Sequence, residues 1–174
     1  MEKNGKQANN GRRSLPVIFI AVAVLLMTAV LLTQNAGRGQ QTGGSEEVRV
    51  IAEGESLVIP AGEVTGDARF YPVEVDGTQM EVLAVRDSAG VIRTAYNTCQ
   101  ICYDSGRGYY VQSGSVLVCQ NCGNRFTADQ VEVQSGGCNP WPIFPQSKTV
   151  TDEAVCISYD ELHRATEIFA GWKQ

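Results

Sequence analysis

Hydrophobic positions occur along this chain in two ways, first as one unbroken run and then in alternation with polar positions. The unbroken run covers residues 15–33, LPVIFIAVAVLLMTAVLLT, and contains no charged side chain. At about 1.5 Å per residue, a helix of this length spans roughly the 30 Å hydrocarbon core of a bilayer. The pattern therefore predicts one transmembrane helix over residues 15–33.

The sequence around this run indicates an uncleaved signal anchor. A cleaved signal peptide has a shorter apolar stretch, about 7–15 residues, followed by small residues of the Ala-x-Ala kind. Residues 33–36, TQNA, make a poor cleavage site, and no cysteine follows the run directly to carry a lipid. Residues 1–14 hold four basic side chains against one acidic one. Because such basic flanks stay in the cytoplasm, we expect residues 1–14 to be a cytoplasmic tail in a single-pass cell-membrane protein.

The next segment, residues 34–47, reads QNAGRGQQTGGSEE and has no apolar side chain larger than Ala. It cannot contribute to a core, so we interpret it as a flexible linker. Residues 48–174 then form the folded part, which the charge asymmetry places outside the cytoplasm.

In this folded part the apolar positions alternate with polar ones, which is the period of β-strands. Two such runs, Tyr71–Val75 and Met80–Arg86, flank the turn sequence Asp76-Gly77 and predict a hairpin. Further short runs, separated by turn residues, lie at 48–59, 91–96, 109–112 and 115–118. The domain is therefore expected to be mainly β.

One segment near the end of the chain has a helical period instead. Ser158 and Glu161 have the spacing of a capping box. Apolar residues then recur at helical spacing: Leu162, Ala165, Ile168, Phe169 and Trp172. We expect a C-terminal helix that begins after Ser158 and continues to Trp172.

Charge and composition exclude several classes of function. The net charge is −5, and since residues 1–14 contribute +3, the remainder carries −8. An acidic body without a basic run offers no surface for phosphates, so nucleic-acid binding is not expected. His163 is the single histidine, so Ser/His/Asp triads and HExxH zinc sites would have to use it. Its place on the expected helix makes it a surface or half-buried residue rather than a ligand.

The most informative residues are Cys99, Cys102, Cys119 and Cys122, which form two C-x2-C motifs with a gap of 16 residues. Two residues between thiolates allow a tight loop to present both sulfurs to one ion at about 2.3 Å, and a hairpin between the motifs brings the second pair to the same ion. Gly123 supports this interpretation, because glycine adopts the positive φ that turns backbone N–H groups toward sulfur. Zinc and iron-sulfur clusters both accept four thiolates, so the spacing does not identify the metal.

Other interpretations of these four cysteines stay open. An extracytoplasmic compartment permits disulfides, and a thiol–disulfide redox protein would use a C-x2-C pair without metal. Thioredoxin-like enzymes place that pair at the start of a helix, and neither motif here precedes an expected helix. A structural zinc ribbon that supports an interaction surface is a further alternative.

Two cysteines lie outside the motifs. Cys138 belongs to the segment GGCNPWPI, which is too rich in Gly and Pro to be a strand or helix, and Cys156 lies in a short apolar run. Either the two form one disulfide, or Cys138 joins the metal site as a fifth ligand or resolving thiol. In the second case Cys156 is a buried small hydrophobic residue.

Three segments together resemble a known family: NTCQIC at 97–102, VCQNCGNRF at 118–126 and GGCNPWPI at 136–143. They are similar to the FtrD-like membrane iron-sulfur containing proteins. The resemblance implies a membrane-anchored metallodomain that handles electrons or metal, associated in some members with periplasmic ferrous-iron uptake. It implies that the four C-x2-C cysteines are the ligands, with Cys138 as a further member of the motif. Some relatives have several membrane spans and this chain has one, so a transporter or redox partner would be a separate protein.

The cysteine segments also have a looser likeness to Rieske domains, in which two loops of a β scaffold hold a two-iron cluster under a Pro-rich loop. Rieske centres have two histidines on one iron, and Cys102 and Cys122 stand in their place here. Ligation by thiolates alone predicts a lower potential, nearer that of ferredoxins. We therefore expect a small Rieske-like or zinc-ribbon-like metallodomain that binds an iron-sulfur cluster or iron, or alternatively zinc, and that is not an enzyme.

Overall fold

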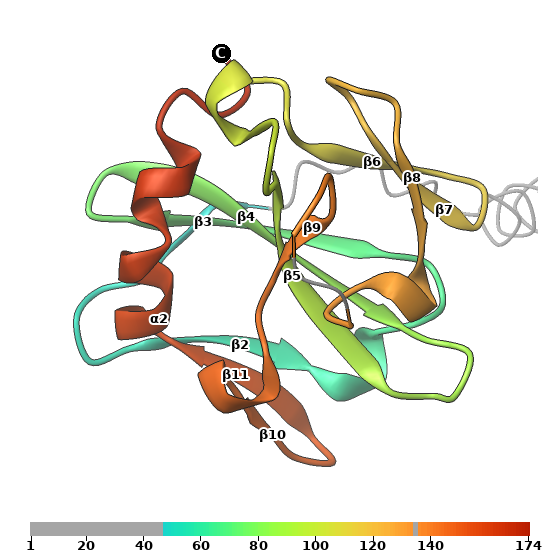
Figure 1. Ribbon diagram of the computed structural model, residues 1–174. Coiled ribbons are helices and arrows are strands. Elements are labelled where there is room, and N and C mark those ends of the chain that lie inside the picture. The colour runs from blue at the N-terminus through green and yellow to red at the C-terminus, as the bar shows by residue number, and fades with distance from the viewer. Residues whose placement is uncertain (1–46, 134–135) are drawn as a thin grey trace, which may run out of the picture. The chain divides into compact units, whose positions relative to one another are not determined.

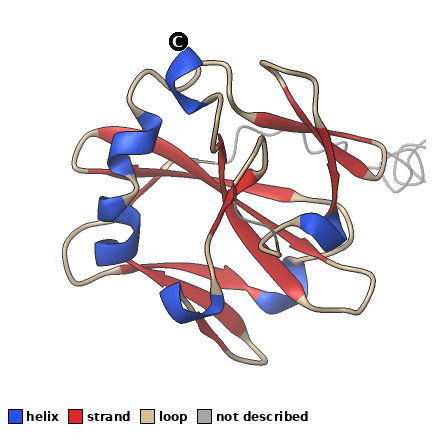
Figure 2. Cartoon of the chain, viewed as in Figure 1, coloured by secondary structure: helices blue, strands red, loops and turns tan. Residues whose placement is uncertain are grey.

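The computed structural model describes residues 47–133 and 136–174 (Figure 1). The predicted transmembrane helix and cytoplasmic tail lie outside these residues, as does the predicted linker except for its last position. Within the described ranges, no helix has the length and apolar character needed to cross a bilayer. These ranges form three β-sheets and one α-helix joined by short turns, so the prediction of a mainly β domain with a C-terminal helix is confirmed (Figure 2).

The largest sheet has the strand order β1-β3-β4-β5-β9. Neighbouring strands are antiparallel except for the parallel pair β1 and β3. Its strands are β1 (Arg49–Val50), β3 (Arg69–Val75), β4 (Thr78–Arg86), β5 (Ile92–Cys99) and β9 (Pro140–Pro142). Strands β3 and β4 are the hairpin predicted around Asp76-Gly77, and both turn residues have positive φ, as a tight two-residue hairpin turn requires.

Two smaller antiparallel sheets complete the domain. One has the order β10-β11-β2, with β10 (Thr149–Val150), β11 (Ala154–Ser158) and β2 (Ser56–Pro60). The other has the order β6-β7-β8, with β6 (Tyr110–Ser113), β7 (Val116–Cys119) and β8 (Arg125–Thr127). The β6–β7 hairpin is the one predicted from the runs at 109–112 and 115–118. In the chain this third sheet lies between β5 and β9, which pair with each other in the largest sheet.

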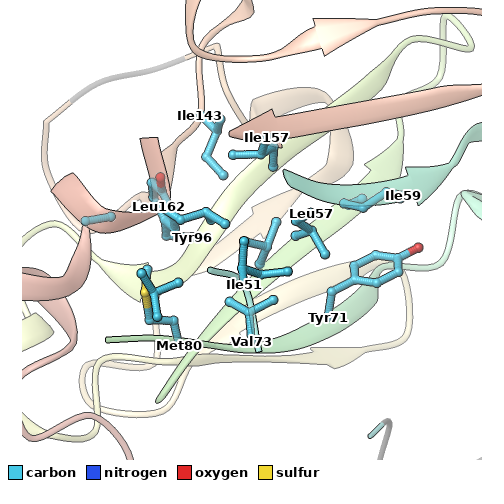
Figure 3. Packing of buried hydrophobic residues seen from close by; sticks show 14 of the residues in the cluster. Ile51, Leu57, Ile59, Tyr71, Val73, Met80, Tyr96, Ile143, Ile157 and Leu162 are labelled. Atoms are coloured by element: carbon cyan, nitrogen blue, oxygen red, sulfur yellow. The ribbon is translucent and has the colours of Figure 1, made fainter. Parts of the chain in front are cut away.

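Strand β4 separates two hydrophobic clusters, because successive side chains of a strand point to opposite faces. Met80 and Val82 belong to the first cluster, which packs the largest sheet against β2, β11 and the C-terminal helix (Figure 3). Leu83 and Val85 belong to the second cluster, which also contains apolar residues of β7 and β8. The second cluster includes Cys99, Cys102 and Cys119, so three thiols are part of a hydrophobic core.

The C-terminal helix is shorter than its apolar spacing predicts. Helix α2 covers Tyr159–Arg164, and the N–H group of Glu161 donates to Ser158 Oγ as the cap requires. A 3-10 turn over Thr166–Phe169 then replaces the expected α-helix. The indole N–H of Trp172 donates to a backbone carbonyl of β5 at 2.8 Å. Packing of the chain end against β5 therefore takes precedence over the local helical period.

Candidate metal centre

The first cysteine motif begins where β5 ends. Cys99 is the last residue of that strand and is fully buried. Its sulfur accepts hydrogen bonds from the backbone N–H groups of Ile101 and of Cys102, the latter at 3.4 Å. Cys102 is buried, and a 3-10 turn over Tyr103–Ser105 follows it. The C-x2-C loop thus wraps its backbone donors around the first sulfur.

A glycine ahead of β6 makes this loop possible. An added Cβ at Gly108 would lie 2.4 Å from the carbonyl oxygen of Cys102 and 2.9 Å from the backbone nitrogen of Tyr103. Both neighbours are backbone atoms, which cannot move aside as a flexible side chain would. The return of the chain into β6 therefore requires glycine at this position.

The second motif has the same design. Cys119 is the last residue of β7 and is buried, and its sulfur accepts hydrogen bonds from the backbone N–H groups of Asn121 and Cys122. Gly123 has φ +75° and donates its N–H to the carbonyl oxygen of Cys119 at 2.9 Å. The positive φ expected at Gly123 is confirmed. Cys122 itself is exposed.

The loop that precedes β9 brings Cys138 to the same place. Pro140, at the start of β9, pairs with Cys99 at the end of β5. The prediction that segment 136–143 contains no strand is therefore wrong for Pro140–Pro142, because pairing with β5 imposes an extended backbone that the Gly and Pro content does not reveal. The side-chain Oε1 of Gln100 accepts a hydrogen bond from the backbone N–H of Gly136 at 2.8 Å. The backbone N–H of Gln100 donates to the carbonyl oxygen of Asn139 at 3.1 Å. The covering loop, defined here as Gly136–Asn139, is thereby attached to the residue that follows Cys99.

Among the described residues, two groups of three sulfurs lie within mutual reach of one ion. Cys99, Cys102 and Cys119 form the inner trio, and Cys102, Cys122 and Cys138 form the outer trio. Within each trio the sulfur atoms lie within 4.8 Å of one another, and Cys102 belongs to both. The fold therefore brings both C-x2-C motifs and Cys138 together.

Cys156 does not take part in this cluster. It lies in β11, opposite Val58 of β2, and is half-buried rather than buried as the sequence suggests. All six cysteines, each within the described residues, are free. The alternative disulfide between Cys138 and Cys156 is not formed, because the covering loop holds Cys138 beside Cys102 and Cys122.

The two strand-end thiols differ in acidity. Burial raises the pKa of Cys99, but hydrogen bonds from the Tyr110 hydroxyl and the backbone N–H groups of Ile101 and Cys102 outweigh it, and the net pKa lies below the ordinary value. Burial raises the pKa of Cys119 to about 12. The hydrogen bonds around Cys99 therefore favour its thiolate, the form that binds metal.

The outer thiols show a similar contrast. Burial raises the pKa of Cys122, but the backbone N–H of Asn124 and the neighbouring thiols more than compensate, so its pKa is below the ordinary value. For the other two thiols burial is the largest effect. It raises the pKa of Cys102, and it raises the pKa of Cys138 to about 12. Each motif thus supplies one thiol whose pKa is lowered, Cys99 in the first and Cys122 in the second.

Two polar residues at the site could not be identified from the sequence. Tyr110 pairs with Cys119 across β6 and β7, and its hydroxyl reaches both Cys99 and the carbonyl oxygen of Cys138. Gln100 carries a buried Nε2 donor that has no hydrogen-bond partner within the part of the chain that the structure describes. A buried donor without an acceptor is costly, and an anionic sulfur centre supplies acceptors. Together with the five clustered thiols, the Tyr110 hydroxyl and the buried Gln100 donor fit a thiolate-bound metal centre.

His163 lies elsewhere, as the sequence indicates. It is exposed on α2, and its Nδ1 atom lies 2.6 Å from a carboxylate oxygen of Asp76. It belongs to neither sulfur trio. The prediction that His163 is a surface residue is confirmed.

Comparison with known proteins identifies a family, and the solved structures that this chain resembles include a Rieske monooxygenase. The family model described as "membrane iron-sulfur containing protein FtrD-like" matches residues 64–169. No curated protein matches the chain. The crystal structure of the quaternary ammonium Rieske monooxygenase CntA in complex with an inhibitor is 19% identical, with a TM-score of 0.39. That match covers 61% of this chain and 31% of the monooxygenase chain, so this chain spans less than a third of its length.

Proposed function

This chain belongs to the FtrD-like family of membrane iron-sulfur containing proteins, and from that premise we propose that its β domain holds an iron-sulfur centre for electron transfer. In this proposal the protein ligands are the four motif cysteines, Cys99, Cys102, Cys119 and Cys122. The observation that carries it is the convergence of both C-x2-C turns on one place, each beginning at the end of a strand.

The surroundings of the sulfurs support a redox role. Cys99 and Cys119 lie inside a hydrophobic cluster, which excludes water, and backbone N–H groups point at both sulfurs. When bound, an iron-sulfur centre supplies one-electron oxidation and reduction, and its potential depends on hydrogen bonds to sulfur and on solvent exposure. The chain's own contribution is to hold the thiolates in place and donate hydrogen bonds to them.

The location of the domain is part of the proposal. Residues 15–33 would anchor the chain, residues 1–14 would remain in the cytoplasm, and residues 34–47 would tether the domain outside the cytoplasm. There the domain would pass electrons to or from a membrane partner connected with iron uptake. One membrane span does not form a transport path, so the partner would supply it.

The Rieske-like interpretation of the fold also remains a proposal. It is supported by the order of elements, in which cysteine turns follow β5 and β7 and a Pro-containing segment follows the covering loop. A metal-free thiol–disulfide enzyme has less support. Cys102 is followed by a three-residue 3-10 turn and Cys122 by the turn into β8, so neither motif begins an α-helix that would activate a thiol.

The test is purification of the full chain from membranes in detergent without oxygen. We expect a coloured protein that contains iron and acid-labile sulfide, and that gives an electron paramagnetic resonance signal in one of its two oxidation states. Stoichiometric zinc without iron would replace the proposal by a structural zinc site. Absence of metal would refute it.

Two single substitutions control this experiment. Cys119→Ser removes a buried strand-end ligand and is expected to abolish iron binding. Cys156→Ser removes a thiol in another sheet and should leave the iron content unchanged. Equal iron loss in both variants would mean that the thiols act through folding and not as ligands.

A further inference from the structure

The site holds five thiols, one more than the four ligands that the proposed function requires. The inner and outer trios both contain Cys102, and the fifth thiol, Cys138, belongs to the outer trio. The inference that follows rests on the proposed function and concerns what this extra thiol does.

The inner and outer sides of the centre differ in how firmly they are held. Cys99 and Cys119 are strand-end residues with exposed fractions of 0% and 1%. Cys122 lies beyond the end of β7, on a turn, and is exposed. A ligand on an exposed turn moves at lower cost than one within a packed strand. The outer side is therefore where a ligand can leave.

Cys138 is placed next to that weaker ligand. Its sulfur lies within 4.8 Å of the sulfurs of Cys102 and Cys122, and it is a half-buried residue of the covering loop itself. The Tyr110 hydroxyl donates to the carbonyl oxygen of Cys138, and the Asn139 side chain donates to the carbonyl oxygen of Gly136 at 2.6 Å. These bonds, with those to Gln100, hold Cys138 beside Cys102 and Cys122. A loop that only shielded the centre would not need a thiol at this point.

We propose that Cys138 is an exchangeable ligand that takes the place of Cys122 at the outer metal position. In the exchange one metal–sulfur bond to Cys122 breaks and one to Cys138 forms. The Cys138 thiol gives up its proton and the departing Cys122 thiolate accepts one, so the proton count is unchanged and no electron is transferred. Cys99 and Cys119 stay bound throughout.

This exchange would give the outer metal position contact with solvent without opening the inner trio. While Cys122 is detached, its exposed thiol can lose its proton to solvent and bind a divalent cation such as ferrous iron, and the ion can then pass to the outer trio. The inner position, within the hydrophobic cluster, would not take part. The outer trio would then be the place where iron is loaded or lost.

Brief alkylation of the iron-loaded full chain under anaerobic conditions tests the exchange without any substitution. Mass spectrometry of peptides from the intact chain then shows which thiols react. If the ligands exchange, chains alkylated at Cys122 alone and chains alkylated at Cys138 alone both appear, and few chains carry both. Reaction at Cys138 alone would mean a fixed set of four ligands, and reaction at neither would mean five fixed ligands. Either result overturns the proposal.

Variants give an independent measurement. Cys122→Ser is expected to keep its iron, because Cys138 supplies the missing thiolate, and the double variant Cys122→Ser/Cys138→Ser is expected to lose it. Cys138→Ser alone should keep iron but slow its transfer to a chelator by about tenfold, because the exchange that opens the outer position is lost. Equal iron loss in Cys122→Ser and the double variant would refute the exchange. Circular dichroism of each variant checks that it folds.

The two proposals can fail separately. Absence of iron in the wild-type protein would refute the proposed function. Iron in the wild-type protein with a single, fixed alkylation pattern would leave that function in place and refute only the exchange. Cys156→Ser, far from the trios in the fold, is the matched control for loss of a half-buried thiol.

Discussion

The hydroxyl group of Tyr110 donates a hydrogen bond to the backbone carbonyl oxygen of Cys138, which joins the β6-β7-β8 sheet to the covering loop. Its single proton is shared between that carbonyl oxygen and the sulfur of Cys99, as in a three-centre hydrogen bond. One side chain thus contacts one inner sulfur, that of Cys99, and the loop that carries Cys138. Its removal should affect both stability and redox behaviour.

We predict that Tyr110→Phe lowers the reduction potential of the centre by about 20–60 mV. Loss of one hydrogen bond, worth roughly 0.5–1.5 kcal/mol, makes the more negative, reduced state less favourable, and 59 mV corresponds to a tenfold change for one electron. Anaerobic redox titration measures the shift. Tyr109→Phe is the matched control, since the Tyr109 ring packs on Trp172 instead. An unchanged potential in Tyr110→Phe would contradict the prediction.

Gly108→Ala should destabilise the domain by about 1–3 kcal/mol, because the added Cβ overlaps the backbone of the first cysteine loop. Iron content should fall with it, since Cys102 is displaced. Thermal unfolding and iron analysis measure the two effects. At Gly66 an added Cβ meets nothing within 4 Å, so Gly66→Ala serves as the control. A Gly108→Ala protein as stable as wild type would show that the loop has room to move.

A buried ion pair joins the segment before the covering loop to the segment after β9. Lys148 Nζ lies 2.5 Å from Glu132 Oε2, both side chains are 2% exposed, and Glu132 also accepts the backbone N–H of Thr94 on β5. We predict that Lys148→Met costs about 3–5 kcal/mol, because it leaves a buried carboxylate unpaired. The double variant Glu132→Gln/Lys148→Met should recover part of that loss. Chemical denaturation measures all three proteins.

An exposed ion pair provides the comparison. The side chains of Arg69 and Glu63 are 42% and 44% exposed. Glu63→Gln breaks this pair and should lower the free energy of unfolding by about 0–1 kcal/mol. If Lys148→Met costs no more than Glu63→Gln, burial of the Lys148 pair does not determine its contribution.

The stability of the domain should fall below about pH 4 in part because of Asp87. Burial raises the pKa of this carboxyl, but hydrogen bonds from the N–H groups of Val91 and Ala89 and from Arg93 outweigh it, so the folded pKa lies below that of the unfolded chain. Its stabilising contribution is complete above the unfolded pKa and is lost as the pH falls through the folded one. Asp87→Asn should therefore reduce the dependence of the melting temperature on pH in this range. Asp152→Asn, which changes an exposed carboxylate, should leave that dependence as in the wild type.

Local patterns predicted most of the strands correctly. The hairpin around Asp76-Gly77 and the one around Ser113-Gly114 follow from alternation and turn chemistry within a few residues. The cap at Ser158 is also local and is confirmed. The helix after it ends early, because Trp172 packs against β5. The residues next to Trp172 in the sequence do not predict this contact.

For the cysteines, the sequence alone determined which residues form the two C-x2-C turns and that glycine must follow the second, since turn geometry depends on adjacent residues. Only the tertiary structure decided that Cys138 joins them while Cys156 does not, and that Tyr110 and Gln100 contact the site. The pairing of β9 with β5 places the covering loop, and such pairings join residues some 40 positions apart. Contacts between distant strands arise from the packing of whole sheets, and a local pattern does not carry that information.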